Sequence, residues 1–203
     1  LLWVVYLLLS VSEAVLLRFV GGMGWFDAVC HTFTTMATGG FSTRSASIGA
    51  FNSAAVDWII TFFMFLAGIN FSLHYRALTG KPGAYWRDAE FRFYAILLLV
   101  VISVITLNVY VADLASFGAS LRQAAFTTVS IVTTTGFATA DFDQWPEAVR
   151  ILLVGMMFFG GCAGSTGGSM KIVRVYIIVK MMIREIKVFM RPSAVIQPKL
   201  GGK

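Results

Sequence analysis

Charged side chains are scarce in this sequence. Only 13% of its 203 residues are Asp, Glu, Lys or Arg, whereas 58% are hydrophobic. An ordinary soluble domain carries about one quarter charged residues. The composition therefore excludes a typical soluble domain and predicts an all-α membrane protein, provided that the apolar residues gather in long runs.

Cysteine and histidine are also few. The two cysteines, Cys30 and Cys162, lie in apolar or glycine-rich surroundings, where we expect them to be small buried hydrophobic residues. His31 and His74 have no partners at the spacing of a metal site, so we expect them to pack or to form hydrogen bonds. The sequence predicts no cofactor and no resident metal.

Three apolar runs are long enough to cross a bilayer, at residues 1–20, 54–78 and 91–112. A transmembrane helix needs about 20 residues to cross a hydrocarbon core of about 30 Å. A fourth run, residues 148–159, is shorter and ends in "GGCAGSTGGS". The chain is therefore predicted to cross a cell membrane several times.

The basic residues indicate which side of the membrane is cytoplasmic. Most of them lie after the second run or after the glycine-rich stretch: Arg76, Lys81, Arg87 and Arg92, then Lys171, Arg174, Lys180, Arg184, Lys187, Arg191, Lys199 and Lys203. Positive charge accumulates in short cytoplasmic loops. Both segments are predicted inside, so the net charge of +6 reflects topology, and nucleic-acid binding is not expected.

The sequence repeats weakly at a spacing of 96 positions. "GFST" at 40–43 aligns with "GFAT" at 136–139, and the same shift places the first apolar run on the third. Each unit reads as a span, a short helix, a Thr/Gly segment and a second span. We therefore predict tandem parallel span–pore-loop–span repeats at 1–78 and 91–191, joined by a cytoplasmic linker at 79–90 and followed by a cytoplasmic tail at 192–203.

Each Thr/Gly segment follows a short helix that enters the membrane from outside. These helices are predicted at 25–37 and 121–133, and their C-terminal ends carry a partial negative charge that favours cations. Glycine allows successive carbonyls to point the same way, and rings of carbonyls replace the hydration shell of K⁺ in selectivity filters. Turns that only pack the bundle are the alternative. Two copies in register favour a filter.

The stretch from Gly160 to Ser169 is predicted to break the last helix inside the membrane. Each glycine costs a helix up to about 1 kcal/mol relative to alanine, and irregular backbone is tolerated in a membrane only beside protein or a cavity. Such a loop would gate the pathway, and a flexible connector is the alternative. A phosphate-binding loop requires Lys followed by Ser or Thr. Ile172 follows Lys171, so no enzyme is predicted.

Several polar residues leave their roles open. Lys171 and Arg174 either sense the cation pathway or hold the glycine-rich stretch through backbone carbonyls. Asn70 and Ser72 either line a vestibule or bond a neighbouring helix. Glu13 lies in the first run with no evident partner. The acidic residues of one outer loop either concentrate cations or form a solvated turn: Asp141, Asp143 and Glu147.

These motifs resemble the Trk/Ktr/HKT superfamily of K⁺ transporters and channels, and its bacterial TrkH branch in particular. The resemblance rests on "FDAVCHTFTTMATGGFST", "NFSLHYRAL", "YWRDAEFR", "TTVSIVTTTGFATADFDQWP" and, most specifically, "GGCAGSTGGSMKIVR". That family is similar to a K⁺ channel tetramer fused into one polypeptide of four repeats. This chain resembles the second and third repeats, so we expect it to be part of a longer chain.

The resemblance implies K⁺ uptake across the bacterial inner membrane, with K⁺ as the transported ion. The implied filter residues are Ala37, Thr38, Gly39, Gly40, Phe41, Thr133, Thr134, Thr135, Gly136 and Phe137. The candidate gate comprises Gly160, Gly161, Gly164, Ser165, Thr166, Gly167, Gly168 and Lys171. A homodimer and a cytoplasmic ring of nucleotide-binding subunits are implied as partners. The alternatives are a non-conducting membrane scaffold that docks a cytoplasmic partner and a Na⁺/K⁺ transporter of the same family.

Overall fold

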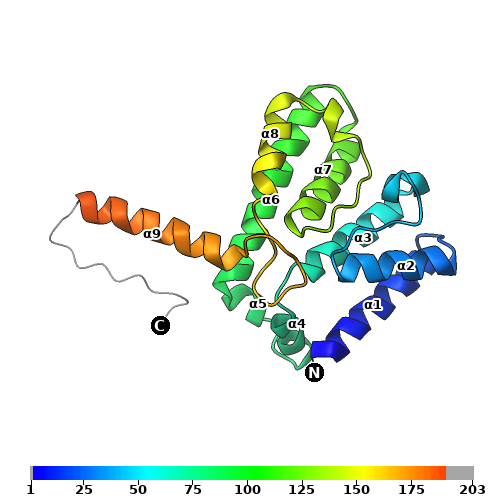
Figure 1. Ribbon diagram of the computed structural model, residues 1–203, viewed down its shortest axis with the longest axis horizontal. Helices are drawn as coiled ribbons and strands as arrows, with labels where there is room; N and C mark the ends of the chain where they lie inside the picture. The colour runs from blue at the N-terminus through cyan, green and yellow to red at the C-terminus, as the bar shows by residue number, and fades with distance from the viewer. Residues whose placement is uncertain (1, 191–203) are drawn as a thin grey trace.

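The computed structural model of the chain describes residues 2–190, and most of this range is helical (Figure 1). The only β-type pairing within these residues is an isolated bridge between Phe159 and Met170. Residue 191, where the second predicted repeat ends, and the predicted tail at 192–203 lie outside the described residues.

The first half of the chain forms four α-helices and a short 3₁₀ helix: α1 (Leu2–Phe19), α2 (Trp25–Met36), η1 (Ser47–Phe51), α3 (Ala54–Ala67) and α4 (Phe71–Leu78). The second half follows as α5 (Ala84–Arg87), α6 (Ala89–Val111), α7 (Phe117–Val132), η2 (Phe142–Gln144), α8 (Glu147–Met156) and α9 (Ile172–Met190). Figure 1 shows α6, α7 and α8 beside the helices of the first half, with α9 projecting away from the body.

Two of these helices, α1 and α6, are long and apolar enough to cross a membrane, and the pair α3 and α4 would form a third, bent span. Large apolar side chains on α1 and α6, including Trp3, Val11, Ile96 and Leu99, are exposed. An apolar surface of this extent is typical of a chain that meets lipid or other protein. The predicted class, an all-α protein with membrane-spanning helices, agrees with this arrangement.

The second apolar run differs from the prediction, because residues 54–78 do not form one helix. The axes of α3 and α4 meet at 100° across a break at Gly68, Ile69 and Asn70. Gly68 packs so closely that a Cβ there would lie 2.4 Å from the hydroxyl oxygen of Tyr94. Asn70 begins the next helix by accepting a hydrogen bond from the Ser72 amide at 2.9 Å. Close packing followed by a side-chain cap therefore turns the chain.

The second short helix also differs from its predicted range. It begins at Phe117 rather than at residue 121, although its end at Val132 matches the prediction. Phe117 makes an edge contact with Tyr110 of α6, with ring centroids 5.7 Å apart. This contact beyond the repeated sequence explains why α7 is one turn longer than α2.

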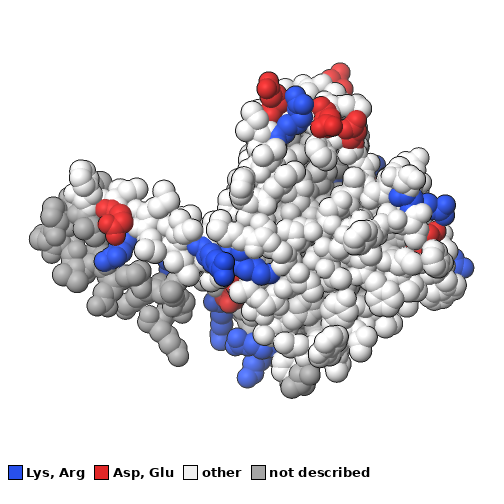
Figure 2. Space-filling model, in the orientation of Figure 1, with Lys and Arg blue, Asp and Glu red and all other residues white. Residues whose placement is uncertain are grey.

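The two halves pack around a shared core. Tyr94 of α6, Phe126 of α7 and Ile60 of α3 are fully buried. An ion pair between Arg122 of α7 and Asp57 of α3, with Nε and Oδ2 3.3 Å apart, also joins the halves. On the face seen in Figure 2, basic side chains gather where α9 leaves the body and near α5, whereas acidic side chains gather at the far end of α7 and α8.

Candidate functional site

The first Thr/Gly segment, residues 37–41, turns the chain back at the end of α2. Thr38 and Gly40 have positive φ angles of 51° and 67°, a region that residues other than glycine rarely adopt. The amides of Thr38 and Gly39 donate to the carbonyls of Thr35 and Thr34 at 2.9 and 2.7 Å. These amides thus bond the last turn of α2 and not carbonyls of the segment itself.

The second Thr/Gly segment, residues 133–137, has the same backbone form. Thr134 and Gly136 have φ angles of 60° and 86°. The amides of Thr134 and Thr135 donate to the carbonyls of Ile131 and Ser130 at 3.0 and 2.9 Å. Each of these bonds corresponds to one in the first segment at a spacing of 96 residues. Two turns with the same hydrogen-bond pattern therefore follow α2 and α7.

A side-chain hydroxyl fixes the outer end of each segment. The Thr34 Oγ1 donates to the Phe41 carbonyl at 2.8 Å, and the Ser130 Oγ donates to the Phe137 carbonyl at 2.7 Å. These two donors are also 96 positions apart, one on each short helix. Sequence analysis did not single out Thr34 or Ser130, although their alignment in the repeat was an available signal.

The two Thr/Gly segments lie directly against each other. A Cβ built on Gly40 would lie 1.9 Å from the carbonyl oxygen of Thr135, closer than any two such atoms can approach. Only glycine fits this position, because it has no Cβ and tolerates a positive φ. Within the second segment, the hydroxyls of Thr133 and Thr135 are 2.8 Å apart. The arrangement concentrates carbonyl and hydroxyl oxygens where the segments meet.

The glycine-rich loop, residues 160–169, contacts both Thr/Gly segments. The Thr38 hydroxyl donates to the Thr166 carbonyl at 3.1 Å, and the Gly168 amide donates to the Thr134 hydroxyl at 2.7 Å. Thr38 and Thr134 are equivalent positions of the repeat. The loop therefore touches the same threonine of each segment.

The other side of this loop packs against the break between α3 and α4. The Cys162 amide donates to the Gly68 carbonyl at 2.8 Å, and the Phe71 amide donates to the Gly164 carbonyl at 3.1 Å. A Cβ on Gly164 would lie 2.9 Å from the side-chain oxygen of Asn70. Asn70 therefore caps α4 and packs against the loop, whereas the Ser72 side chain is exposed.

Lys171 holds the loop through a backbone carbonyl, which was one of the two roles considered for it. Its ammonium group donates to the Gly167 carbonyl and lies 3.4 Å from the Ser165 hydroxyl. Arg174 is exposed, and its backbone amide bonds the Lys171 carbonyl at 2.9 Å. The candidate gate residues thus form one closed unit, in which a Cβ on Gly160 would lie 2.1 Å from the Gly168 carbonyl.

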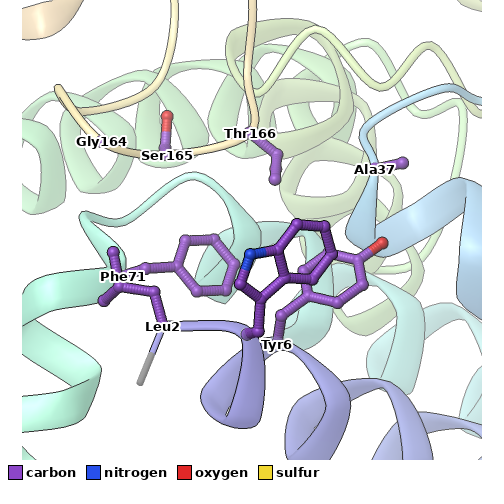
Figure 3. Close-up of a pocket in the computed structure, with 8 residues that line it drawn as sticks. Leu2, Tyr6, Ala37, Phe71, Gly164, Ser165 and Thr166 are labelled. Carbon is purple, nitrogen blue, oxygen red and sulfur yellow. The ribbon is translucent and has the colours of Figure 1, made fainter.

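A cavity of about 520 Å³ opens beside the loop. It is lined by residues of α1, of α4, of the first Thr/Gly segment and of the loop: Leu2, Trp3, Tyr6, Ala37, Phe71, Gly164, Ser165 and Thr166. Figure 3 shows the aromatic ring of Phe71 and the Tyr6 side chain below the loop, with Thr166 and Ala37 above them. The loop and the first Thr/Gly segment therefore both border this cavity.

Both histidines form the hydrogen bonds that the sequence led us to expect. His31 Nδ1 lies 2.7 Å from the Asp27 carbonyl, and its Nε2 lies 2.8 Å from the Ser42 hydroxyl. His74 bonds the Tyr85 hydroxyl at 2.7 Å and the Leu66 carbonyl at 3.0 Å. Over residues 2–190, no group of three or more His, Cys, Asp or Glu is arranged to hold a metal.

The acidic residues outside the spans serve mainly local structure. Asp141 accepts hydrogen bonds from the Asp143 amide at 3.1 Å and from the Gln144 side chain at 3.0 Å, as in a solvated turn. Asp27 accepts a hydrogen bond from the Thr43 hydroxyl and pairs with Arg44 at 3.0 Å. The Thr43 bond, and then Arg44, hold the pKa of Asp27 below its usual range.

A match to a known family model identifies the family of this chain. The TrkH family model, described as a cation transport protein, matches residues 1–203. The chain belongs to the TrkH family. This family consists of ion transporters. That agrees with the prediction, made from the glycine-rich stretch, that the chain is not an enzyme.

Individual TrkH-family relatives support this assignment. The chain is 42% identical over 208 residues to the Trk system potassium uptake protein TrkH of Salmonella typhimurium, and 37% identical over 203 residues to TrkG of Escherichia coli. It matches the crystal structure of the potassium transporter TrkH from Vibrio parahaemolyticus with a TM-score of 0.95 and 40% identity, covering 100% of this chain and 44% of that one. The chain spans 42% of the length of each of the first two relatives.

Proposed function

We propose that this chain supplies two of the segments of a K⁺ selectivity filter in a TrkH-family potassium transporter of the bacterial inner membrane. The observation that carries the proposal is the duplicated Thr/Gly turn, whose two copies meet at Gly40 and Thr135. Potassium filters coordinate the ion by backbone carbonyls from several chain segments. The names of the relatives, which are potassium uptake proteins, support K⁺ as the ion.

The filter in this proposal is completed by segments outside this chain. The two repeats, 1–78 and 91–191, contribute Ala37 to Phe41 and Thr133 to Phe137. The relatives are more than twice as long as this chain, which leaves room for two further repeats. A homodimer and a cytoplasmic nucleotide-binding ring remain proposals that rest on the resemblance alone.

The glycine-rich loop is proposed as the gate of this pathway. Its contacts with Thr38 and Thr134 support a gate over a flexible connector, because a connector has no need to bond both filter segments. The cavity bounded by Tyr6, Phe71 and Thr166 is then the vestibule on the cytoplasmic side. In this arrangement a loop that moves away from the threonines opens the path from filter to vestibule.

The hydroxyls of Thr34 and Ser130 provide a direct test of the filter. In the full-length transporter, Thr34→Val or Ser130→Ala should lower the preference for K⁺ over Na⁺ without stopping transport. Each variant removes a hydrogen bond worth about 1 kcal/mol from a filter carbonyl, so we expect a loss of roughly fivefold in selectivity. Ion flux into proteoliposomes under K⁺ and under Na⁺ gradients measures it.

Thr106→Val is the matched control for this experiment. Thr106 is buried in α6, where its hydroxyl bonds the Ile102 carbonyl at 2.7 Å within the same helix and no residue of either segment. It should keep wild-type selectivity. Equal selectivity in all three variants would contradict the filter assignment, and an unselective wild-type protein would favour a Na⁺/K⁺ transporter. A wild-type protein that carries neither ion would favour the scaffold.

A further inference from the structure

Glu90, near the start of α6, connects the glycine-rich loop to the first turn of α9. Its Oε1 accepts hydrogen bonds from the Ala163 amide at 2.7 Å and from the Val173 amide at 3.0 Å. Ala163 lies within the loop, and Val173 lies in the first turn of α9. A single carboxylate oxygen thus connects two points of the chain that are ten residues apart.

The carboxylate supplies a hydrogen-bond acceptor that the two amides lack within a helix. The first amides of a helix have no partner within the helix, and a negative charge is favourable at that end. The Val173 amide is of this kind, and Ala163 lies where the backbone is irregular. Because Glu90 is partly buried, water cannot readily replace it, and hydrogen bonds to a charged acceptor are stronger than neutral ones.

The bonds to Glu90 divide the loop into fixed and movable parts. Beyond them, the Thr38 and Thr134 hydroxyls and the charged Lys171 ammonium group hold Ser165 to Gly168 in place. Glu90 and Lys171 lie close enough to interact electrostatically. The carboxylate therefore fixes Ala163 of the loop relative to α9 and lies near the lysine that bonds the Gly167 carbonyl.

We propose that Glu90 is the positioning residue that keeps the glycine-rich loop in its closed place beneath the filter. This inference rests on the proposed gate function of that loop. Glu90 makes no contact with the filter segments among the described hydrogen bonds, so its loss alters how often the loop is closed and not which ion is selected. Removal of both hydrogen bonds shifts the closed–open equilibrium toward open.

The test compares Glu90→Ala, Glu90→Gln and Asp88→Ala in the full-length transporter, with K⁺ and Na⁺ flux into proteoliposomes as the readout. Two bonds to a charged acceptor are lost in Glu90→Ala, so basal K⁺ flux should rise about tenfold or more with unchanged selectivity. Glu90→Gln keeps an acceptor oxygen and should restore most of the closed state. Asp88→Ala is the control, because Asp88 also carries a carboxylate at the start of this helix, where it caps the Phe91 amide at 2.8 Å, and among the described hydrogen bonds it makes none to the loop.

A general loss of stability predicts a different pattern. It would lower flux in both alanine variants, and Glu90→Gln would give no rescue, which overturns the proposal. If the Glu90→Ala protein does not reach the membrane, Glu90→Asp replaces it as the test variant. Aspartate keeps the charge but withdraws the carboxylate by about 1.5 Å, the length of one carbon–carbon bond. A wild-type basal flux in Glu90→Asp then overturns the proposal.

The same experiment in a protein that lacks residues 163–168 separates this inference from the gate itself. If the loop is the gate and Glu90 holds it, Glu90→Ala should add less than about twofold to the flux of the deleted protein, since coupled residues are not additive. If the deletion raises flux but Glu90→Ala in the otherwise intact transporter does not, only the role of Glu90 is overturned. A deletion without effect overturns the gate, and the inference falls with it.

Discussion

Replacing Gly40 by alanine is expected to abolish K⁺-selective uptake by the full-length transporter. The new Cβ would lie 1.9 Å from the Thr135 carbonyl oxygen and 2.9 Å from the Thr135 carbonyl carbon. Alanine at φ +67° also costs on the order of 1–2 kcal/mol. The Thr/Gly segments must then move apart, which displaces the carbonyls that we propose as ligands of the ion. Growth of a K⁺-uptake-deficient host on low K⁺, together with flux in proteoliposomes, measures the loss.

Gly118→Ala is the control for this substitution. Gly118 lies in the first turn of α7, where an added Cβ would have no heavy atom within 4 Å, and its φ is not positive. It should keep wild-type uptake and selectivity. If Gly40→Ala is present in the membrane in normal amounts and still selects K⁺ over Na⁺ as the wild type does, the Thr/Gly segments are not the filter.

Deleting Ala163 to Gly168 is expected to raise K⁺ flux severalfold while leaving selectivity intact. The deletion removes the Thr166 carbonyl and the Gly168 amide, which are the contacts of the loop with Thr38 and Thr134. Hydrogen bonds of this kind contribute about 1 kcal/mol each, so the loss of both shifts the closed–open equilibrium by up to about 30-fold, and the flux rises with the fraction of open protein. Single-channel recording or proteoliposome flux separates the rate from the ion preference.

Two valine substitutions provide a milder version of this experiment. A Cβ on Gly164 would lie 2.9 Å from the Asn70 side-chain oxygen, and one on Gly167 would lie 3.0 Å from the Thr133 carbonyl oxygen. Bulky side chains do not fit either place, so Gly164→Val and Gly167→Val should favour the withdrawn loop and raise flux. Normal expression with wild-type rate and regulation in the deletion and in both valine variants would contradict a gate.

Features that repeat in the sequence could be predicted, whereas features made by contact between distant segments could not. The ends of α2 and α7, at Met36 and Val132, follow from a Thr/Gly pattern that occurs twice. The position of the broken helix follows from glycine, which disfavours helix wherever it accumulates. These signals are local, so a single sequence contains them.

The break at Gly68 was missed because its cause lies elsewhere in the chain. Residues 54–78 form one long, mostly apolar run, and a single glycine is a weak signal in a membrane helix. The turn is stabilised by Tyr94 and by the amide of Cys162, which are remote in sequence. The role of Glu90 was missed for the same reason, since nothing near residue 90 indicates that residues 163 and 173 lie beside it.

The contact between the α3–α4 break and the glycine-rich loop has a consequence for the order in which the protein assembles. The carbonyls of Ala67 and Gly68 are left without helical partners, and they are satisfied by Thr166 and Cys162. An unsatisfied backbone carbonyl in a hydrocarbon environment costs several kcal/mol. The ribosome makes Gly68 long before Cys162, so these partners are absent when residues 54–78 are first made. We therefore expect the bend between α3 and α4 to reach its final form late in assembly, once residues 160–169 are in place.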